Sequence, residues 1–556
     1  MVKKTLPIGK DDFRKIRESE IESYYVDKTL MIKDFIEHGN EVTLITRPRR
    51  FGKTLNMTML RDFFDVTQDS RDIFDGLAIM GTAHAERMNT VPVVSLSLKG
   101  CSGKTVEDLE TAIAEEMFKE YKKYGNYLAN VDKSNVAYLR FFQALEVLAH
   151  KGGEKERNKH LQNNLVYLQN SLVYLIEALY TFYGVRPIVL IDEYDNPIIE
   201  AHQGGFREEF SNFYSTFLTV VLKGNPHLGQ AMLTGIQRVA KESIFSKLNN
   251  IVVYTVLDEQ YCQYFGLTSE EIRILLNEYD LALNDEVKLY YNGYLFSGLQ
   301  IYNPWSILNF ANTKKLRSYW INTSTNALIK ESVLGAEPSF HRAFKKLIAN
   351  GEVTVRVNLS ASFAELPKTE TLWGLFVNAG YLTVLHEDYR MHRLTVRIPN
   401  EEIKSEFEEI VSDYTKLSSD MLQEMLIALK DGEMDEFFEI YKELVIESTS
   451  YHDAKENAYH MLMLGMSMNL RDIYNIMSNI ESGHGRSDLI LKSKDAKRPH
   501  IIIEFKQGED VEKLKHEALQ QIKDKKYYAG LTGEILLIGL AHDKKVCQLE
   551  HTTITV

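Results

Sequence analysis

The stretch Arg47–Thr54 combines residue types that can bind phosphate. It reads Arg-Pro-Arg-Arg-Phe-Gly-Lys-Thr and stands between the apolar run Val42–Thr46 and a helix-like segment. Gly52 allows the backbone to approach a phosphate, Lys53 can set an ammonium against the β- and γ-phosphates, and Thr54 can offer its hydroxyl to Mg²⁺. The helix N-terminus adds free N–H groups and the positive end of a dipole. Strand, turn and helix in this order predict a phosphate-binding loop, with a helix entry that exposes a lysine as the alternative.

Two adjacent acids follow a second predicted strand. Ile188–Ile191 is a continuous apolar run, typical of a parallel strand covered on both faces, and Asp192 and Glu193 come directly after it. An Asp at this place in phosphate-loop enzymes holds Mg²⁺, and a Glu after it can polarise the attacking water. The alternative is a strand that ends in solvated acids, but two carboxylates at a buried strand end repel each other unless a cation is near. These residues predict ATP–Mg²⁺ binding, with Glu193 as the catalytic residue for hydrolysis.

A third strand is expected near Ala231–Ile236, with Thr234 toward its polar end and Arg238 shortly beyond. ATPases with an additional strand carry a polar side chain on it, between the phosphate loop and the Asp-Glu strand, where it contacts the γ-phosphate. By that analogy Thr234 is a candidate phosphate ligand. Arg238 could stabilise phosphate charge as an arginine finger does, or serve only as an ion-pair partner within the fold.

The C-terminal region carries a second set of residues suited to chemistry on phosphates. Gly485–Leu491 has Asp488 at the start of an apolar strand, and the later strand Ile501–Lys506 contains Glu504 and Lys506 on the same face. An Asp followed by Glu-x-Lys on a neighbouring strand is how a restriction-type nuclease builds its metal site. The two carboxylates would hold Mg²⁺ or Mn²⁺, the metal would activate water, and the lysine would position or help deprotonate it. Glu-x-Lys alone is also common by chance.

Several longer segments resemble the bacterial AAA-ATPase-like proteins. The segments are Leu6–Gly9, Tyr25–Thr29, Ile45–Thr54, Ile191–Asp195, Leu233–Ile236 and Tyr302–Ser306. An arginine in place of the usual first loop glycine is part of that family's pattern. Such proteins are similar to the STAND-type branch of P-loop ATPases and commonly end in a PD-(D/E)xK nuclease domain. The resemblance covers nearly the whole chain and implies a set of nucleotide-binding residues, with Mg²⁺ on the loop threonine and the first strand acid. These residues are Arg47, Arg49, Arg50, Phe51, Gly52, Lys53, Thr54, Asp192, Thr234, Arg238 and Pro304.

The same resemblance extends the candidate nuclease site. Ala518–Tyr528 looks like the glutamine-containing helix of the nuclease family, which implies Gln521 as a catalytic-site residue. Ser450–Asp453 and Glu456 resemble that family's first helix, and Glu456 is the candidate extra metal ligand. Asp488 follows a serine rather than a proline, a variation that the family tolerates. The lysines between residues 513 and 526 either contact phosphate or form a solvated helix face.

The order of predicted elements indicates a multidomain α/β protein. Apolar residues at helical spacing predict an amphipathic helix over 163–182, and the polar run 151–159 predicts an exposed loop. Strands alternate with helices in the first half of the chain, which is typical of a parallel sheet. They are expected near 42–46, 92–98, 187–192, 231–235 and 251–256.

Five domains are expected along the chain. They are a P-loop ATPase domain (1–265), a helical lid (266–330), a winged-helix-like module (331–400), an acidic helical linker (401–445) and a restriction-endonuclease-like α/β nuclease domain (446–556). Within the lid, Tyr302–Trp305 is expected to close over adenine through Pro304, with plain core packing of Trp305 as the alternative. The runs 381–385 and 393–398 predict the hairpin of the winged-helix-like module.

Composition limits the partners. The net charge of −13 opposes broad attraction to nucleic acid, although a local basic channel can act within a Debye length of about 8 Å. No apolar run approaches the roughly 20 residues of a membrane span, and the N-terminus lacks the apolar core of a signal peptide. Cys101, Cys262 and Cys547 are expected to be buried thiols in a reducing cytosol. We therefore expect a cytoplasmic protein with nucleic acid, DNA before RNA, as a transient substrate and no membrane partner, while self-association stays open.

Two function classes remain at this point. In the first, ATP bound with Mg²⁺ controls a nuclease that uses Mg²⁺ or Mn²⁺. In the second, the protein is an ATP-dependent switch or scaffold whose nuclease-like domain binds nucleic acid or a partner without cleaving. The joint presence of Asp488, Glu504 and Lys506 favours the first, because a domain that only binds has no need of the lysine.

Overall fold

The chain divides into two compact units. Unit 1 comprises Met1–Ile329, Arg356–Leu394 and Pro399–Glu402, and unit 2 comprises Lys330–Val355, Thr395–Ile398 and Ile403–Val556. The structure is a computed structural model. It describes residues 3–150, 154–238, 250–320, 329, 332–333, 335–360, 365, 368–415, 419–448, 470, 473–482, 485–543 and 546–556.

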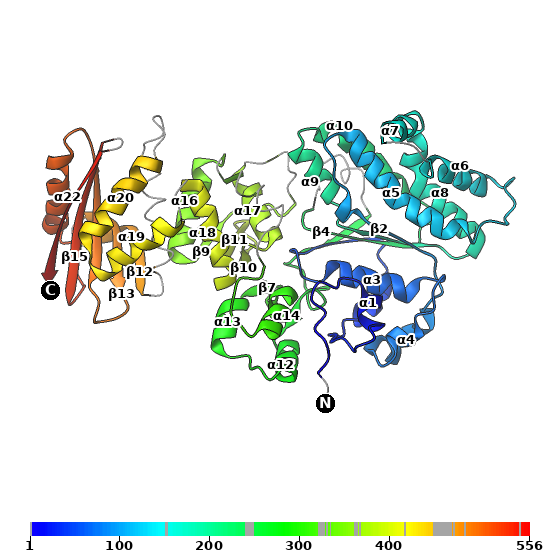
Figure 1. The fold of residues 1–556 in the computed structure, drawn as a ribbon, viewed down its shortest axis with the longest axis horizontal. Helices are drawn as coiled ribbons and strands as arrows, with labels where there is room; N and C mark the ends of the chain where they lie inside the picture. Colours follow the sequence, from blue (N-terminus) through cyan, green and yellow to red (C-terminus); the bar gives the residue numbers. More distant parts are fainter. Residues whose placement is uncertain are drawn as a thin grey trace. The chain divides into compact units, whose positions relative to one another are not determined.

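A five-stranded parallel sheet forms the centre of unit 1 (Figure 1). Its strands follow the order β2 (Val93–Ser97), β3 (Ile188–Asp192), β4 (Gln230–Gly235), β1 (Val42–Thr46) and β5 (Ile251–Tyr254). Every residue of β1 and β3 is buried, and in Figure 1 helices lie on both faces of the sheet. The five predicted strands and their parallel pairing are confirmed. Because β4 lies between β1 and β3, the ends of the three strands that carry candidate site residues are neighbours.

Helices and short 3-10 turns surround this sheet. Before β2 they are α1 (Phe13–Arg17), α2 (Leu30–His38), α3 (Lys53–Phe64), α4 (Arg71–Phe74), η1 (Ala78–Gly81) and η2 (Ala83–Arg87). Between β2 and β3 lie η3 (Leu98–Gly100), α5 (Val106–Gly125), α6 (Val136–Leu148), α7 (Glu154–Asn163) and α8 (Leu165–Tyr183). Between β3 and β4 lie α9 (Asn196–Gln203) and α10 (Arg207–Leu222). In Figure 1, α3 lies on one face of the sheet and α5 on the other.

The helical group between β2 and β3 matches one prediction and contradicts another. α8 confirms the helix predicted over 163–182, with its leucine stripe buried. The loop predicted over 151–159 is wrong from Glu154 onward, where α7 begins. Its Glu, Lys, Arg and Gln side chains lose little freedom in a helix, so a polar run of this composition does not exclude one. Contact with α5 then stabilises it, because the Thr111 hydroxyl donates to Asn158 at 2.8 Å.

The predicted lid region contains strands as well as helices. It comprises β6 (Leu267–Thr268), α12 (Ser269–Glu278), α13 (Asp285–Tyr291), β7 (Tyr294–Phe296), β8 (Leu299–Tyr302) and α14 (Pro304–Thr313). β6, β8 and β7 form an antiparallel sheet, so the expectation of a wholly helical lid is corrected. Strands of two to four residues are too short to show an alternating pattern in the sequence.

Residues 331–400 are shared between the two units. Unit 2 holds α16 (Pro338–Asn350) and β9 (Glu352–Val355), and unit 1 holds α17 (Thr369–Ala379) and β10 (Thr383–Asp388). β10 pairs with β11 (Arg393–Arg397), as expected of the predicted hairpin. The boundary between the units falls within β11, so this stretch is not set apart as one compact body.

Unit 2 is built on a mixed five-stranded sheet. Its order is β12 (Tyr474–Ser482), β13 (Gly485–Ser493), β14 (His500–Gln507), β15 (Glu534–Asp543) and β16 (Val546–Thr555). Only β14 and β15 pair in parallel, and α22 (Val511–Lys525) connects them. A parallel sheet in unit 1 and a mixed sheet with a crossover helix in unit 2 confirm the predicted multidomain α/β class.

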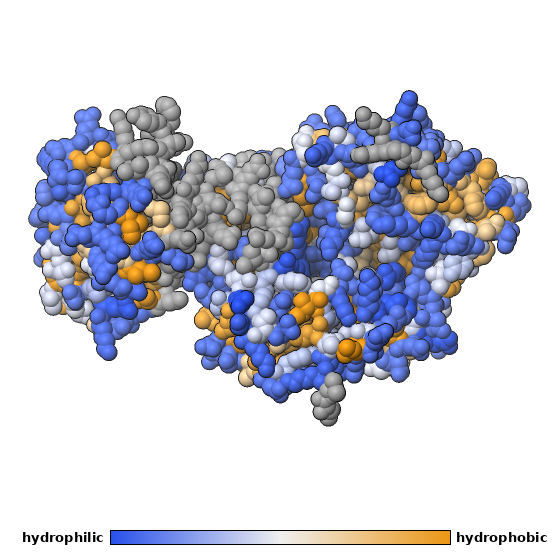
Figure 2. Space-filling model, in the orientation of Figure 1, coloured by the Kyte–Doolittle hydropathy of each residue, from blue (hydrophilic) through white to orange (hydrophobic). Residues whose placement is uncertain are grey.

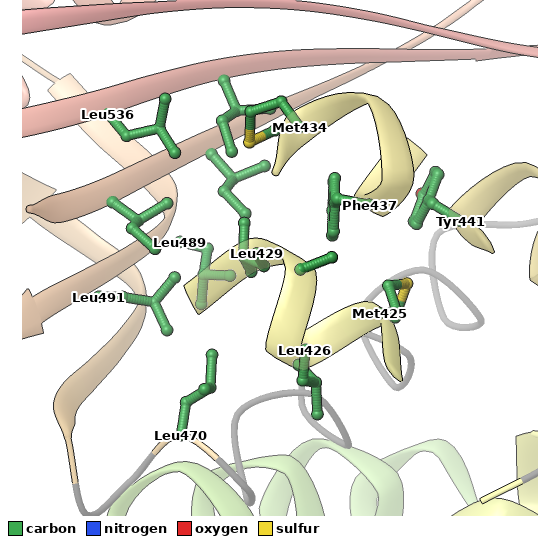
Figure 3. Packing of buried hydrophobic residues seen from close by; sticks show 14 of the residues in the cluster. Met425, Leu426, Leu429, Met434, Phe437, Tyr441, Leu470, Leu489, Leu491 and Leu536 are labelled. Carbon is green, nitrogen blue, oxygen red and sulfur yellow. The ribbon is translucent and has the colours of Figure 1, made fainter. Parts of the chain in front are cut away.

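Both faces of the unit 2 sheet are covered. Ile490, Ile502 and Leu537 pack with α22 on one face. On the other face, Leu489, Leu491 and neighbouring residues pack against α19 (Ser419–Asp431) and α20 (Met434–Ser448), as Figure 3 shows. The segment expected to be a linker therefore supplies core residues to the sheet. Its first helix, α18 (Glu401–Thr415), begins at the end of unit 1.

Figure 2 shows apolar surface over part of the helical group between β2 and β3, where α6 and α8 expose Val136, Leu139, Val166 and Phe182. Within the described part of the chain, no helix has the length and apolar character needed to cross a membrane. The three cysteines are buried free thiols.

Candidate functional site

The phosphate loop, residues 47–54, encloses the ammonium of Lys53. Gly52 precedes α3 with a φ of 84°, in the left-handed region that favours glycine. The Lys53 side chain is buried, and its Nζ donates to the carbonyls of Arg47 and Pro48 at 3.0 Å each. Burial lowers the pKa of Lys53, although the nearby Glu193 and Asp192 carboxylates act in the opposite direction. A cation is thus held inside the loop, at the N-terminus of a helix that already favours anions.

Three predicted residues, one from the start of α3 and two from the strands β3 and β4, meet at the edge of the sheet. The Thr54 hydroxyl donates to Asp192 Oδ2 at 2.6 Å. The Thr234 hydroxyl donates to the other oxygen of the same carboxylate. Asp192 is 4% exposed, so its charge is shielded from water. A threonine hydroxyl and a carboxylate on facing elements are the hard oxygen ligands that Mg²⁺ takes.

Glu193 is held in an unusual backbone conformation beside this cluster. Its φ is 52°, a left-handed value that is strained for a residue with a side chain. Burial raises the pKa of Glu193, Asp192 and Asp195 raise it further, and Lys53 and Arg49 lower it. An acid with a raised pKa next to a fixed cation is suited to hold or polarise a water molecule.

Asp195 belongs to the same region and was missed by the sequence reasoning. It is buried, and its Oδ2 accepts the N–H groups of Ile236 and Gln237 at 2.8 Å each, just beyond β4. A Cβ on Gly235 would lie 2.6 Å from Asp195 Oδ1, so only glycine allows this approach. Asp195 therefore fixes the end of β4 relative to β3. The third acid of the Ile-Asp-Glu-Tyr-Asp run was the available signal for it.

The three arginines of the loop have different surroundings. The guanidinium of Arg47 is fully buried between Phe265 and Phe296 and donates to the carbonyls of Thr46 and Tyr254. Burial lowers the pKa of Arg47 to about 10. Its Nε and Nη2 have no hydrogen-bond partner among the described residues. The side chain of Arg47 is thus directed into the core and away from Lys53, contrary to the expected role as a nucleotide contact.

Arg50 is also directed away from the loop interior. Its guanidinium lies over the ring of Trp305, and its Nη1 donates to the carbonyl of Tyr319. Arg49 is half-buried, and its charge lowers the pKa of Glu193, so it is the loop arginine that acts on the acidic cluster. Arg238 donates to the Ser360 hydroxyl at 3.3 Å. The structure therefore brings together Lys53, Thr54, Asp192, Glu193 and Thr234, with Arg49 beside them.

An apolar cavity of about 90 Å³ adjoins the phosphate loop. Phe51 and Gly52 line it from the loop, and Pro304 lines it from the start of α14. These are three of the residues implied as nucleotide contacts. The rest of the wall includes Tyr24, Tyr25, Val26, Lys28, Leu55, Asn56, Tyr264, Leu267 and Leu308.

The second candidate site lies on the α22 face of the unit 2 sheet. Leu489 pairs with Ile503, which sets Asp488 opposite Glu504 on adjacent strands. Glu504 Oε2 accepts the N–H of Asp488 at 3.3 Å, and Asp488 Oδ2 accepts the N–H of Phe505 at 2.9 Å. Burial raises the pKa of Glu504 to about 7, and the neighbouring Asp488 carboxylate adds to the rise. Two close carboxylates, one of them destabilised as an anion, fit a hard divalent cation.

Lys506, singled out with these acids, and Gln521, which the resemblance implied, lie beside the two carboxylates. The Lys506 ammonium donates to Gln521 Oε1, and the Gln521 amide N–H group donates to Glu504 Oε1. The same Gln521 nitrogen also donates to the Tyr527 hydroxyl oxygen at 2.9 Å, a contact that the sequence did not suggest. Among the described residues no group of three or more His, Cys, Asp or Glu side chains is arranged to hold a metal, and Glu456 lies outside the described residues.

Two family models match the regions of the chain that contain these residues. Residues 7–245 match the family model described as a predicted AAA-ATPase, and residues 454–552 match that of the PD-(D/E)XK nuclease superfamily. The chain is also 28% identical over 554 residues to an "Uncharacterized protein in vnfD 5'region" from Azotobacter chroococcum mcd 1. That alignment covers 95% of this chain and 93% of the relative, so the similarity spans both units.

Proposed function

Because this chain joins an AAA-ATPase-like domain to a domain of the PD-(D/E)XK nuclease superfamily, we propose that it hydrolyses ATP and thereby controls a metal-dependent nuclease. The observation that carries the ATP assignment is the meeting of Thr54, Asp192 and Thr234 beside the enclosed Lys53. These residues come from distant parts of the chain, and the roles of a P-loop site require them together.

In the ATP site each group has a role that follows from its geometry. Lys53 and the N–H groups at the start of α3 bind the β- and γ-phosphates. Thr54 and Asp192 would hold Mg²⁺ through the hydroxyl and carboxylate oxygens that are joined by a hydrogen bond in this structure. Glu193 orients the attacking water, and Thr234 contacts the γ-phosphate side of the site. Arg49 offsets phosphate charge.

The apolar cavity beside Gly52 is the proposed binding place of the adenine. Aromatic and aliphatic side chains line most of it, as is typical of a pocket for a flat base. Pro304 contributes from α14, which supports its expected role in a lid over the base. Lys28 is the charged residue of the wall, and it is already paired with Glu271, so the pocket does not present an unpaired charge to the base.

In unit 2, Asp488 and Glu504 are the proposed ligands of Mg²⁺ or Mn²⁺. The metal, when bound, would lower the pKa of a bound water and stabilise charge on the scissile phosphate. Lys506 supplies a positive charge beside Glu504, since it lowers the pKa of that acid. Gln521 fixes the Lys506 ammonium through its carbonyl and Glu504 through its amide. The proposed substrate is a nucleic-acid phosphodiester.

The test is a cleavage assay on single- and double-stranded DNA and RNA. The purified full chain is incubated with Mg²⁺, Mn²⁺ or EDTA, each with ATP, ADP or no nucleotide. We expect metal-dependent cleavage that changes with the nucleotide, is lost in Asp488→Ala and no longer responds to ATP in Lys53→Ala. Cleavage that persists in EDTA would refute the metal site. Tight nucleic-acid binding without cleavage under any condition would instead favour an ATP-dependent switch or scaffold.

A further inference from the structure

We infer that Glu402 is a positioning residue of the ATP site, which acts through Tyr319 on Arg50 of the phosphate loop and so links nucleotide binding to the first turn of α18. This inference rests on the proposed ATP site and adds to it the route by which the nucleotide state leaves that site. All of the contacts that carry it lie within unit 1.

The first part of the route joins the phosphate loop to the segment 319–320. Arg50 has a φ of 66°, and its guanidinium lies 4.6 Å from the centre of the Trp305 ring. Arg50 Nη1 donates to the carbonyl of Tyr319 at 2.9 Å, and Trp305 Nε1 donates to the same carbonyl at 2.8 Å. One backbone carbonyl thus collects a hydrogen bond from the loop and another from α14. A shift of the loop that moves Arg50 must disturb this shared acceptor.

The second part joins the same segment to Glu402. Glu402 is 1% exposed, and its Oε1 accepts the N–H groups of Tyr319 at 2.7 Å and Trp320 at 3.0 Å. The Ser306 hydroxyl on α14 lies 2.8 Å from Glu402 Oε2. Burial raises the pKa of Glu402 to about 7, while these donors and the charge of Arg50 favour its ionised form. The carboxylate therefore connects α14, the segment 319–320 and the start of α18.

A separate contact supports the same route from the other end of the loop. A Cβ added to Gly380 would lie 2.8 Å from Pro48 Cβ and 3.7 Å from the Trp320 ring. The ring of Pro48 in the loop and the indole of Trp320 thus approach the same small residue. Movement of the loop would therefore displace the segment 319–320 both through the Arg50 hydrogen bond and through this packing.

Glu402 stands at the point in the chain where unit 1 ends and the C-terminal part of unit 2 begins. Glu402 is the last residue of unit 1, and Ile403, the next residue of α18, is the first of the long C-terminal part of unit 2. A two-state change in the loop can therefore alter how the first turn of α18 is held. Such couplings change affinity by about 5–150-fold, and they act equally in both directions. Weakening the Glu402 contacts should accordingly change the affinity for ATP.

Tryptophan fluorescence and ATP affinity test this inference without any cleavage. The chain has three tryptophans, and two of them, Trp305 and Trp320, lie on the route. In the wild-type protein we expect ATP–Mg²⁺ to shift the emission. In Glu402→Gln and in Arg50→Met we expect a roughly 5–20-fold weaker ATP affinity and a smaller emission shift. Glu286→Gln, which removes the same charge from an exposed place on α13, is the matched control and should match wild type.

The double variant decides between a shared route and two separate effects. If Arg50 and Glu402 act through the same Tyr319 peptide, the double variant should be no weaker for ATP than the weaker single variant. Additive losses, or a folded Glu402→Gln protein with wild-type ATP affinity and emission shift, would overturn the inference. If Glu402→Gln does not fold, unchanged ATP affinity and emission in Arg50→Met overturn it equally. Failure of the wild-type chain to bind ATP would instead refute the proposed ATP site itself.

Discussion

The contact between α22 and β15 allows the packing of the nuclease-like unit to be tested by one methyl group. A Cβ on Gly539 would lie 2.5 Å from the carbonyl oxygen of Lys515 and 2.7 Å from the backbone nitrogen of Leu519. Ordinary contact begins at 3.4 Å, so in Gly539→Ala the helix must move away from the sheet by about 0.9 Å. Backbone atoms cannot rotate aside as a side chain can, and overpacking of this kind costs about 1–3 kcal/mol.

The same shift should reach the proposed metal site. Gln521 lies on α22 only two residues beyond Leu519, and it holds both Glu504 and Lys506. A displacement of about 1 Å at a catalytic group can cost about 100-fold in rate, so metal-dependent cleavage should fall by that order in Gly539→Ala.

Hydrogen–deuterium exchange is the assay for this change, because it measures the protection of the α22 backbone amides even if no substrate is cleaved. Peptides from α22 should lose about 5–150-fold of their protection in Gly539→Ala, which corresponds to about 1–3 kcal/mol of local stability. Gly335→Ala is the matched control in the same unit, since a Cβ there meets nothing within 4 Å. Unchanged protection of α22 in the Gly539 variant would show that the helix does not lie against β15 as described.

The remaining predictions concern the two sites directly. Lys53→Ala should abolish tight ATP binding in a calorimetric titration, and wild-type hydrolysis by this variant would contradict the loop assignment. Glu193→Gln should bind ATP normally, because this variant keeps the Mg²⁺ ligands, and should hydrolyse ATP more slowly. Asp488→Ala should lose metal-dependent cleavage and bind Mn²⁺ more weakly, while its unfolding temperature should stay near that of the wild-type protein. Normal cleavage by this variant would point to another site. Tyr527→Phe keeps the buried ring but removes the oxygen that accepts from Gln521, so cleavage should fall by about 5-fold, as expected for one hydrogen bond of about 1 kcal/mol. An unaltered rate and pH profile in the Tyr527 variant would mean that the hydroxyl does not orient the amide.

The parts of the fold that the sequence predicted are those with a strong local pattern. Apolar runs identified β1 and β3, in which every residue is buried, because a parallel strand that is covered on both faces needs no polar alternation. The meeting of Thr54 with Asp192 was also predictable, since a loop after one parallel strand and an acid after another lie at the same edge of the sheet. Asp488 and Glu504 likewise follow from strand pairing and alternation.

The parts that the sequence did not predict depend on contacts between distant residues. Nothing near Glu402 indicates that its carboxylate would accept from Tyr319 and Trp320, more than 80 positions earlier. Tyr527 lies beyond the end of α22, and only the left-handed turn at Lys526 brings the chain back toward the site. Helical periodicity could not reveal either position. The acidic stretch after residue 400 was expected to be a linker for a related reason. Its many charged residues dominate the sequence pattern, whereas the apolar residues of α19 and α20 that pack against the sheet are fewer.

The loop arginines explain how a phosphate loop can dispense with its usual first glycine. Among the described loop residues, Arg50 and Gly52 have a positive φ, and Arg47 does not, so position 47 does not require glycine for its backbone conformation. Its side chain can therefore point out of the loop and bind the carbonyl of Tyr254, the last residue of β5. Arg50 joins the other side of the loop to α14 through the ring of Trp305. The loop is thus held from outside by two arginines whose partners lie about 200 or more positions away, and the phosphate side is left to Lys53 and the helix N-terminus. Because Arg50 joins the loop to α14 and to the segment 319–320, we expect a change in the shape of the loop to move these elements with it.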